Sequence, residues 1–222
     1  MIKLKLLPPE DIKNKAIWFQ KFRNECKAYL AKHGIDYDKF TIVEHDGYIG
    51  FISEWVLSQY IRDEFHDAIK ECSPWEDKFD LKRIERIIEK NSMDEGDVAY
   101  VKEYFYDSWD LMVATKEVAY RCDIKTALTK KEPQLNWNFL YPIIQAEKSG
   151  KDLMILIYYI YEGDDFHNLT GEVLIGATTY DAIKKCPVLK KGDTSKFGTK
   201  SQADNYVTEL SRDYSELSKF IH

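Results

Sequence analysis

The apolar segment from Leu153 to Tyr161 constrains the fold of this chain more than any other feature of its sequence. It is rich in Ile and Tyr, and its length suits a β-strand and falls far short of a membrane-spanning helix. Amphipathic helical patterns precede it, and shorter β-branched and aromatic runs flank it. We therefore expect a mixed α/β (α+β) domain, with a central mixed sheet flanked by helices and a helical N-terminal region.

Three helices are expected in the first part of the chain. Apolar residues recur at helical spacing over Lys13–His33, and Gly34 is a typical stop signal. A second helix should begin near Tyr48 or Gly50 and run to about Cys72. A third is expected over Lys78–Asn91, where the sequence KRIERIIEK is amphipathic. Residues 1–95 should thus form a mainly helical part.

Strand-like segments follow Gly96. The sequence VAYVKEYFY favours a strand, and WDLMVA and EVAYRCDIKTA, separated by Thr115 and Lys116, predict an antiparallel hairpin. FLYPIIQAEKSG favours a short helix ending at Gly150; another strand is expected over Gly171–Thr179 and a short helix over Tyr180–Lys185. Residues 96–180 would form the sheet core, and 181–222 a C-terminal, partly helical and DNA-contacting part, of one domain spanning 1–222.

The composition favours a folded protein. Hydrophobic residues make up 44% of the chain and aromatic residues 14%, which suffices for a packed core and argues against disorder. No segment suits a membrane span or a signal peptide, so we expect a cytoplasmic protein with no membrane partner. The four cysteines are scattered, which favours buried thiols. The net charge of −6 excludes little, because an acidic protein can carry a local basic cleft.

The hairpin carries the residues with a recognisable chemistry. Asp110 stands at the start of its first strand, and Asp123 and Lys125 lie near the end of its second. Antiparallel pairing brings these regions together, and side-chain alternation places Asp123 and Lys125 on one face while Ile124 packs into the core. Carboxylates bind Mg²⁺, which activates water and neutralises phosphoryl charge, and a lysine can hold that water or stabilise that charge. This arrangement suits phosphodiester hydrolysis.

The pattern Asp110, then Asp123-Ile124-Lys125, resembles the signature of the PD-(D/E)xK nuclease superfamily, to which many type II restriction endonucleases belong. The resemblance covers roughly residues 104–161 and implies a restriction-endonuclease-like sheet. It also implies that Asp110, Asp123 and the backbone carbonyl of Ile124 bind Mg²⁺, with Mn²⁺ as a substitute, and that Lys125 assists the nucleophile. Trp109 stands where the name of the signature has proline, and Asp107 is a lower-ranked alternative to Asp110.

Glu54 is a further candidate. On a helix it shares a face with Leu57 and Ile61, and a carboxylate on an apolar face needs a partner. Many nucleases of this type have a helix glutamate that reaches the metal, so the resemblance gives Glu54 a catalytic and metal-binding role. The alternative is a solvated glutamate in the first helical turn, stabilised by the helix dipole. For Asp123 and Lys125 the alternative is an exposed ion pair, which contributes little.

Basic and amide side chains after the hairpin are candidates for DNA contacts, with an ordinary solvated surface as the alternative. Several of them belong to a cluster of lysines near the C-terminus that is interspersed with Gly, Ser and Thr. Lys184 and Lys185 also belong to this cluster. The DNA-binding candidates are Lys130, Lys131, Gln145, Lys190, Lys191, Lys196 and Lys200.

These features together predict a Mg²⁺-dependent, site-specific endonuclease that cuts double-stranded DNA. Cutting both strands usually needs two active sites, so a homodimer is expected. The alternatives are a repair, junction or nicking nuclease with the same chemistry, and a non-catalytic DNA-binding or assembly protein. The histidines share no metal-binding spacing, and neither a phosphate-binding Gly-rich loop nor a Gly-x-Ser-x-Gly motif is present, which disfavours histidine-metal nucleases, ATP-driven enzymes and serine hydrolases.

Overall fold

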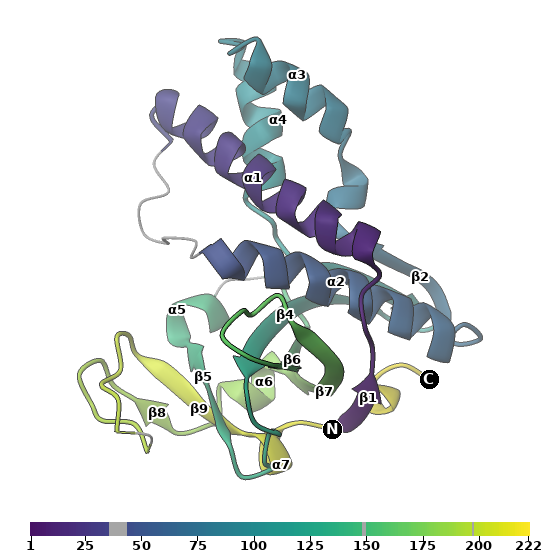
Figure 1. Ribbon diagram of the computed structural model, residues 1–222, viewed down its shortest axis with the longest axis vertical. Coiled ribbons are helices and arrows are strands. Elements are labelled where there is room, and N and C mark those ends of the chain that lie inside the picture. Colours follow the sequence, from purple (N-terminus) through teal and green to yellow (C-terminus); the bar gives the residue numbers. More distant parts are fainter. Residues whose placement is uncertain (36–43, 148–149, 197) are drawn as a thin grey trace.

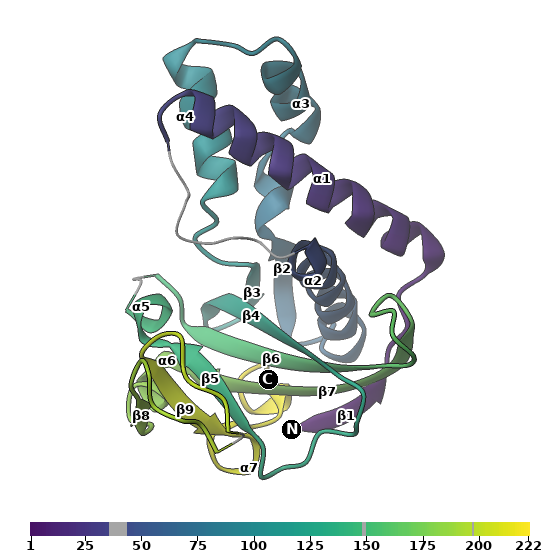
Figure 2. The same cartoon turned by 60° about the vertical axis from the view of Figure 1, so that its left-hand side comes forward.

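The computed structural model describes residues 1–35, 44–147, 150–196 and 198–222. Figure 1 shows a helical end formed by α1, α3 and α4, and a curved sheet below it, with α2 lying between the two. A smaller sheet flanks the curved sheet on the side away from α2, as Figure 2 shows. The mixed α/β class expected from the sequence is confirmed.

The longer helices lie in the first half of the chain. They are α1 (Glu10–Lys32), α2 (Glu44–Glu64), α3 (Leu81–Glu89) and α4 (Glu95–Phe105), with a 3₁₀ helix at Trp75–Lys78. Short helices α5 (Ile143–Ala146), α6 (Tyr180–Ile183) and α7 (Leu210–Asp213) and a 3₁₀ helix at Leu217–Lys219 follow. Among the described residues, no helix combines the length and apolar character needed to cross a membrane.

The main sheet has the strand order β1-β7-β6-β4-β3-β2. Its strands are β1 (Ile2–Lys5), β2 (Ile69–Pro74), β3 (Leu111–Thr115), β4 (Ala119–Thr129), β6 (Leu153–Tyr161) and β7 (Leu169–Thr179). All neighbouring pairs are antiparallel except β4 and β6, which are parallel, so the sheet is mixed. The smaller sheet has the order β5-β9-β8 and consists of β5 (Asn138–Pro142), β8 (Val188–Leu189) and β9 (Asn205–Glu209).

Strand β6 is buried on both faces, as befits a strand at the centre of a covered sheet. Ile155 and Ile157 pack on the side of α2, in a core that also contains Ile124. Met154 and Leu156 pack on the opposite side with Tyr141 of the smaller sheet and Tyr180. The predicted central strand and the predicted burial of Ile124 are therefore confirmed.

A third core holds the helical end together. Phe22 and Tyr29 of α1 pack with Ile84 of α3 and with Tyr104 and Phe105 of α4. The predicted first helix is confirmed, since α1 ends at Lys32 and Gly34 adopts a φ of +72°, a conformation that favours glycine. The predicted third helix is also present, although it begins only at Leu81, where the Asp80 side chain accepts the Arg83 N–H as an N-cap.

Two of the predictions are wrong, one in where a helix ends and one in the type of element. The second helix ends at Glu64, not near Cys72, because Cys72 pairs with Val113 in strand β2. The segment VAYVKEYFY forms helix α4, not a strand. Its helical start follows from Asp94, whose side chain accepts the N–H groups of Gly96 and Asp97, and its aromatic residues then fall on the face that packs against α1. Both predictions relied on the intrinsic preferences of the residues. Strand pairing at Cys72 and the helix cap at Asp94 outweigh those preferences.

The segment after the hairpin also differs from the prediction. Residues 138–142 form strand β5, and among the described residues of this segment the helix is limited to Ile143–Ala146. The expected helix end near Gly150 lies partly outside the described residues, which omit 148–149. Residues 181–222 contain β8 and β9 and little helix, because β9 pairs with both β5 and β8. The hairpin of β3 and β4, strand β7 and the short helix α6 agree with the sequence analysis.

Candidate active site

Asp110 and Asp123 lie opposite each other where β3 begins. The antiparallel register pairs Leu111 with Cys122, so Asp110 and Asp123 are the next residues facing one another. The backbone N–H of Asp110 donates to the carbonyl of Cys122 at 2.9 Å and fixes this position. The predicted proximity of the two aspartates is thus observed, although Asp123 lies in the middle of β4 and not near its end, since β4 continues to Thr129.

The backbone of Ile124 is tied directly to Asp110. The Ile124 N–H donates to Oδ2 of Asp110 at 2.5 Å. In a strand, the N–H and C=O of one residue point to the same neighbour, so the Ile124 carbonyl also faces the Asp110 side of β4. Two carboxylates and one backbone carbonyl therefore border the same end of the hairpin.

Asp123 is buried and carries an unusual number of partners. The Nζ of Lys125 lies 3.1 Å from its Oδ1 and 3.0 Å from its Oδ2. Lys151 forms an ion pair with Oδ1, and the hydroxyl of Tyr141 donates to Oδ2 at 2.8 Å. The side chain of Asp123 is only 1% exposed, so the alternative of an exposed Asp123–Lys125 ion pair is wrong.

The partners of Asp123 keep it charged. Burial by itself would raise the pKa of Asp123, but Lys125, Lys151 and Tyr141 hold it well below its ordinary value. Asp110 behaves in the opposite way, since burial and the nearby charge of Asp123 raise its pKa to about 6, against the opposing effect of the two lysines. The two aspartates thus have pKa values pushed apart, a pattern that is frequent at functional sites.

Tyr141 connects this site to the smaller sheet. It lies in β5, is fully buried, and its hydroxyl is also 2.8 Å from the hydroxyl of Tyr180. The two rings pack edge to face with centroids 5.9 Å apart. The smaller sheet therefore supports the position of the Asp123 carboxylate through one buried phenol.

A second group of carboxylates adjoins Asp110 on the side of α2. Burial raises the pKa of Glu54 well above its ordinary value, and the charges of Glu76, Asp110 and Asp107 raise it further, while Arg23 opposes them. Burial likewise raises the pKa of Glu76 to about 7, with Asp107 and Asp110 adding to the effect. These carboxyl groups oppose one another's ionisation and form an acidic cluster beside the hairpin.

Glu54 lies in the middle of α2, which begins at Glu44, so the alternative of a first-turn glutamate is wrong. It borders a pocket between α1, α2 and the 3₁₀ helix, together with Glu76 and the aromatic residues Phe51 and Trp55. Because α2 and Asp123 lie on opposite faces of the sheet, Glu54 adjoins Asp110 rather than Asp123. Asp107 is exposed and forms an ion pair with Arg23 at 3.5 Å, which supports the preference for Asp110.

The donor set matches the chemistry of a hard divalent cation. Among the described residues, no three His, Cys, Asp or Glu side chains are already arranged around a common metal position. Mg²⁺ however commonly takes one or two carboxylates and completes its shell with water and substrate oxygens. Asp110, Asp123 and the Ile124 carbonyl satisfy that requirement, and the mutual repulsion of the neighbouring carboxylates would be relieved by a bound cation.

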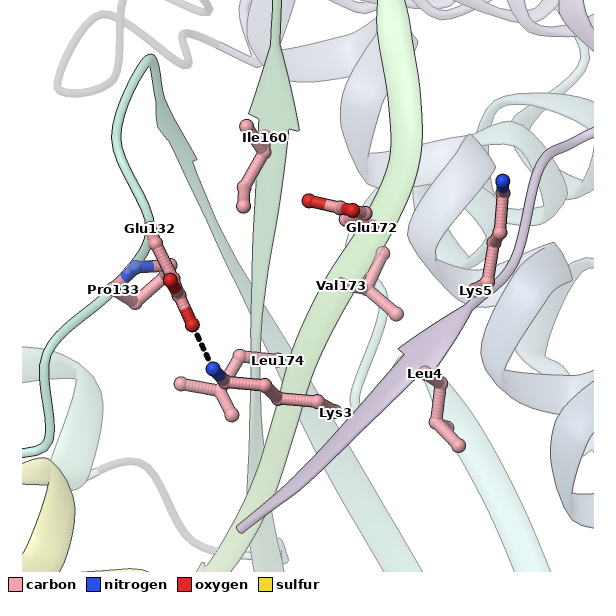
Figure 3. Close-up of a pocket in the computed structure, with 9 residues that line it drawn as sticks. All are labelled: Lys3, Leu4, Lys5, Glu132, Pro133, Ile160, Glu172, Val173 and Leu174. Atoms are coloured by element: carbon pink, nitrogen blue, oxygen red, sulfur yellow. Dashed lines mark hydrogen bonds and ion pairs between the residues drawn. The ribbon is translucent and has the colours of Figure 1, made fainter.

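The candidate DNA-contact residues are spread over two regions. Lys130 and Lys131 follow β4, and Lys130 pairs with Asp164 at 2.9 Å. Lys130 lies five positions after Lys125, which corresponds to roughly 16 Å along an extended chain. Glu132, next in the chain, forms an ion pair with Lys3 at a pocket that Ile160, Glu172 and Val173 also line, as Figure 3 shows. This pocket is remote from the carboxylates along β4.

The remaining candidates surround the smaller sheet. Gln145 is half-buried in α5, directly after the strand that carries Tyr141. Lys190 pairs with Asp204 at 3.1 Å, and Lys196 donates to the carbonyl of Asn136 and the side chain of Asn138. Lys191 and Lys200 are exposed. Their roles in DNA binding stay predictions.

Three residues near the carboxylates were missed in the sequence analysis: Glu76, Tyr141 and Lys151. Lys151 reaches Asp123 because β6 pairs in parallel with β4, which sets Leu153 beside Cys122. Tyr141 was assigned to a helix, and Glu76 lies in a segment for which no element was expected. A correct pairing of β6 with β4 would have drawn attention to Lys151, whereas the other two depend on contacts between distant segments.

Comparisons of the chain with protein-family models, curated proteins and solved structures gave no match. The geometry of the site and the sequence pattern on it therefore carry the functional argument.

Proposed function

We propose that this protein is a Mg²⁺-dependent DNA endonuclease of the PD-(D/E)xK type. The observation that carries the proposal is the register of the β3–β4 hairpin, which sets Asp110 opposite Asp123 and places the Lys125 ammonium 3.0 Å from Asp123. A mixed sheet flanked by helices, with these residues on adjacent strands, supports the restriction-endonuclease-like fold that the sequence resemblance implies.

Each residue has a role that follows from its position. Asp110, Asp123 and the Ile124 carbonyl would hold the cation, with Glu54 contributing from α2 on the Asp110 side. The cation would supply an activated water and neutralise phosphoryl charge. Burial opposes the charged form of Lys125, but Asp123 and Asp110 outweigh it and raise the pKa of Lys125. Lys125 therefore stays protonated and acts by orienting the water and stabilising negative charge, not as a general base.

The substrate we propose is double-stranded DNA, bound by the exposed lysines of the smaller sheet and of the loop after β4. We further propose a homodimer, because one active site hydrolyses one strand and a symmetric pair hydrolyses both. Site-specific cutting would then require a symmetric target sequence.

Digestion of phage DNA and supercoiled plasmid tests the proposal. The purified protein is incubated with each substrate in Mg²⁺ and, in parallel, in EDTA. Discrete duplex fragments in Mg²⁺ alone are expected. Nicked circles without linear products would favour the nicking or repair alternative. DNA binding without cleavage in Mg²⁺ or Mn²⁺ would contradict the nuclease proposal and leave the DNA-binding alternative.

A further inference from the structure

We propose that Lys151 is a second functional lysine of this site, which binds a non-bridging oxygen of the phosphate that is cut. The inference rests on the proposed function and deepens it. Lys151 lies just before β6, outside the Asp-x-Lys pattern, and it forms an ion pair with Asp123.

Asp123 does not require Lys151 to neutralise its charge. Lys125 lies within 3.1 Å of both carboxylate oxygens, and Tyr141 donates to one of them, so the charge of Asp123 already has a cation and a hydrogen bond. Burying much of a second lysine has a desolvation cost, which a carboxylate already neutralised by Lys125 does little to offset. The side chain of Lys151 is 12% exposed and that of Lys125 26%, so both side chains are largely buried but keep some access to solvent.

The reaction calls for an additional positive charge. In hydrolysis the oxygen of water forms a bond to phosphorus, its proton passes to solvent, and the bond from phosphorus to the sugar oxygen breaks as that oxygen takes up a proton. The phosphodiester carries one negative charge and the phosphorane-like transition state carries two. Asp110 and Asp123 are balanced by Lys125 and Lys151 before substrate is bound. The ammonium of Lys151 would stabilise the charge that develops on the phosphoryl oxygens.

The same contact makes Lys151 a competitor of the divalent cation. Its ammonium occupies one oxygen of Asp123, an oxygen that a bound cation would also use. Removing the ammonium should therefore strengthen Mg²⁺ binding while it weakens catalysis. A lysine that merely anchors the start of β6 would not combine tighter Mg²⁺ binding with slower cleavage in a folded variant.

The experiment compares Lys151→Met and Lys151→Arg with the wild-type full chain. Mg²⁺ binding without DNA is measured by calorimetry, and cleavage of plasmid is measured under single-turnover conditions. Lys116→Met is the matched control, because Lys116 is exposed in the turn between β3 and β4, and thermal melts show whether each variant is folded.

We expect Lys151→Met to bind Mg²⁺ about 10-fold more tightly and to cleave about 100-fold more slowly, and Lys151→Arg to cleave within about 10-fold of the wild type. Cleavage by Lys151→Met at the wild-type rate would overturn the inference, as would an equal loss in both variants with Mg²⁺ binding unchanged or weaker. A wild-type protein that cleaves no DNA would instead contradict the proposed function, and this inference with it.

Discussion

The carboxylate of Asp110 accepts the backbone N–H of Ile124 over 2.5 Å, across the two strands of one hairpin. This bond gives Asp110 a structural as well as a proposed metal-binding role, and the two roles can be separated. In Asp110→Asn the side-chain oxygen can still accept the N–H, so the fold should persist while Mg²⁺ binding weakens and cleavage falls at least about 100-fold. In Asp110→Ala the N–H loses its acceptor, and the free energy of unfolding should fall by about 1–3 kcal/mol.

Urea unfolding and plasmid cleavage check this pair of variants. Equal activity of Asp110→Asn and wild type would contradict the role of Asp110. It would direct attention to Asp107, which lies three residues earlier and pairs with Arg23.

The carboxylates near α2 should destabilise the metal-free protein. Glu76 is disfavoured in its charged form by burial and by Asp107 and Asp110, so Glu76→Gln should raise the free energy of unfolding in EDTA at pH 8 by about 1 kcal/mol. Glu54→Gln should act in the same direction and should also reduce the increase in Tm that Mg²⁺ produces, since Glu54 is a proposed ligand. Thermal melts with EDTA and with Mg²⁺ measure both effects. If both variants had a lower Tm than the wild type in EDTA, the carboxyl groups would not destabilise the metal-free protein.

The same repulsion sets a pH dependence. The pKa of Asp110 is raised from 3.8 to about 6 and that of Glu76 from 4.5 to about 7. A carboxyl group whose pKa is higher in the folded than in the unfolded protein loses stability as pH rises, because the unfolded state releases its proton first. In EDTA these two groups should therefore lower the free energy of unfolding between about pH 4 and pH 7.5.

The pKa of Asp123 is lowered, so its contribution to stability would be lost only as the pH falls below the ordinary pKa of an aspartate. That loss lies outside this window. Chemical unfolding at a series of pH values checks the trend, with Glu76→Gln as the control that should flatten it. Stability that rises from pH 5 to pH 7.5 in the wild type, and to the same extent in the variant, would contradict it.

Elements and site residues could be predicted from the sequence where neighbouring residues determine the structure. The hairpin could be predicted because β-branched runs flank a short polar turn, and its pairing then placed Asp110 beside Asp123. The helix over residues 95–105 could not, because its aromatic residues suit strands and only the Asp94 cap and the packing against α1 favour the helix. Glu76, Tyr141 and Lys151 reach the site through contacts between segments far apart in the chain, and no local pattern reports such contacts.

The phenol of Tyr141 offers a test of how Asp123 is held. Tyr141→Phe removes the hydrogen bond to a buried, charged acceptor and should lower the free energy of unfolding by about 1.5–3 kcal/mol. Tyr180→Phe removes a hydroxyl that lies 2.8 Å from that of Tyr141 and whose interaction with Asp123 is less direct, so its effect should be smaller, at about 1 kcal/mol. Urea unfolding of the two variants compares them. If Tyr180→Phe lowered the free energy of unfolding as much as Tyr141→Phe or more, the hydrogen bond from Tyr141 in the smaller sheet would not be what holds Asp123.

Exposed lysines allow a test of the DNA surface. Lys131→Ala and Lys200→Ala change side chains in the loop after β4 and next to the smaller sheet, respectively. If each contacts a phosphate, each should weaken DNA binding at all sequences alike and reduce the dependence of log K on log salt by about 1. Binding titrations at several salt concentrations, with Lys116→Ala as the control, measure this. An unchanged slope would remove that lysine from the interface.

Single-turnover cleavage by Lys125→Met is the decisive test of the proposal that Asp123 and Lys125 perform metal-dependent DNA cleavage. The wild type, Lys125→Met and the control Lys116→Met are compared on plasmid in Mg²⁺ and in EDTA, after thermal melts show that all three are folded. We expect cleavage by the wild type and the control in Mg²⁺ only, and a loss of at least about 100-fold in Lys125→Met. Cleavage by Lys125→Met at the wild-type rate, or cleavage that persists in EDTA, would contradict the proposed function.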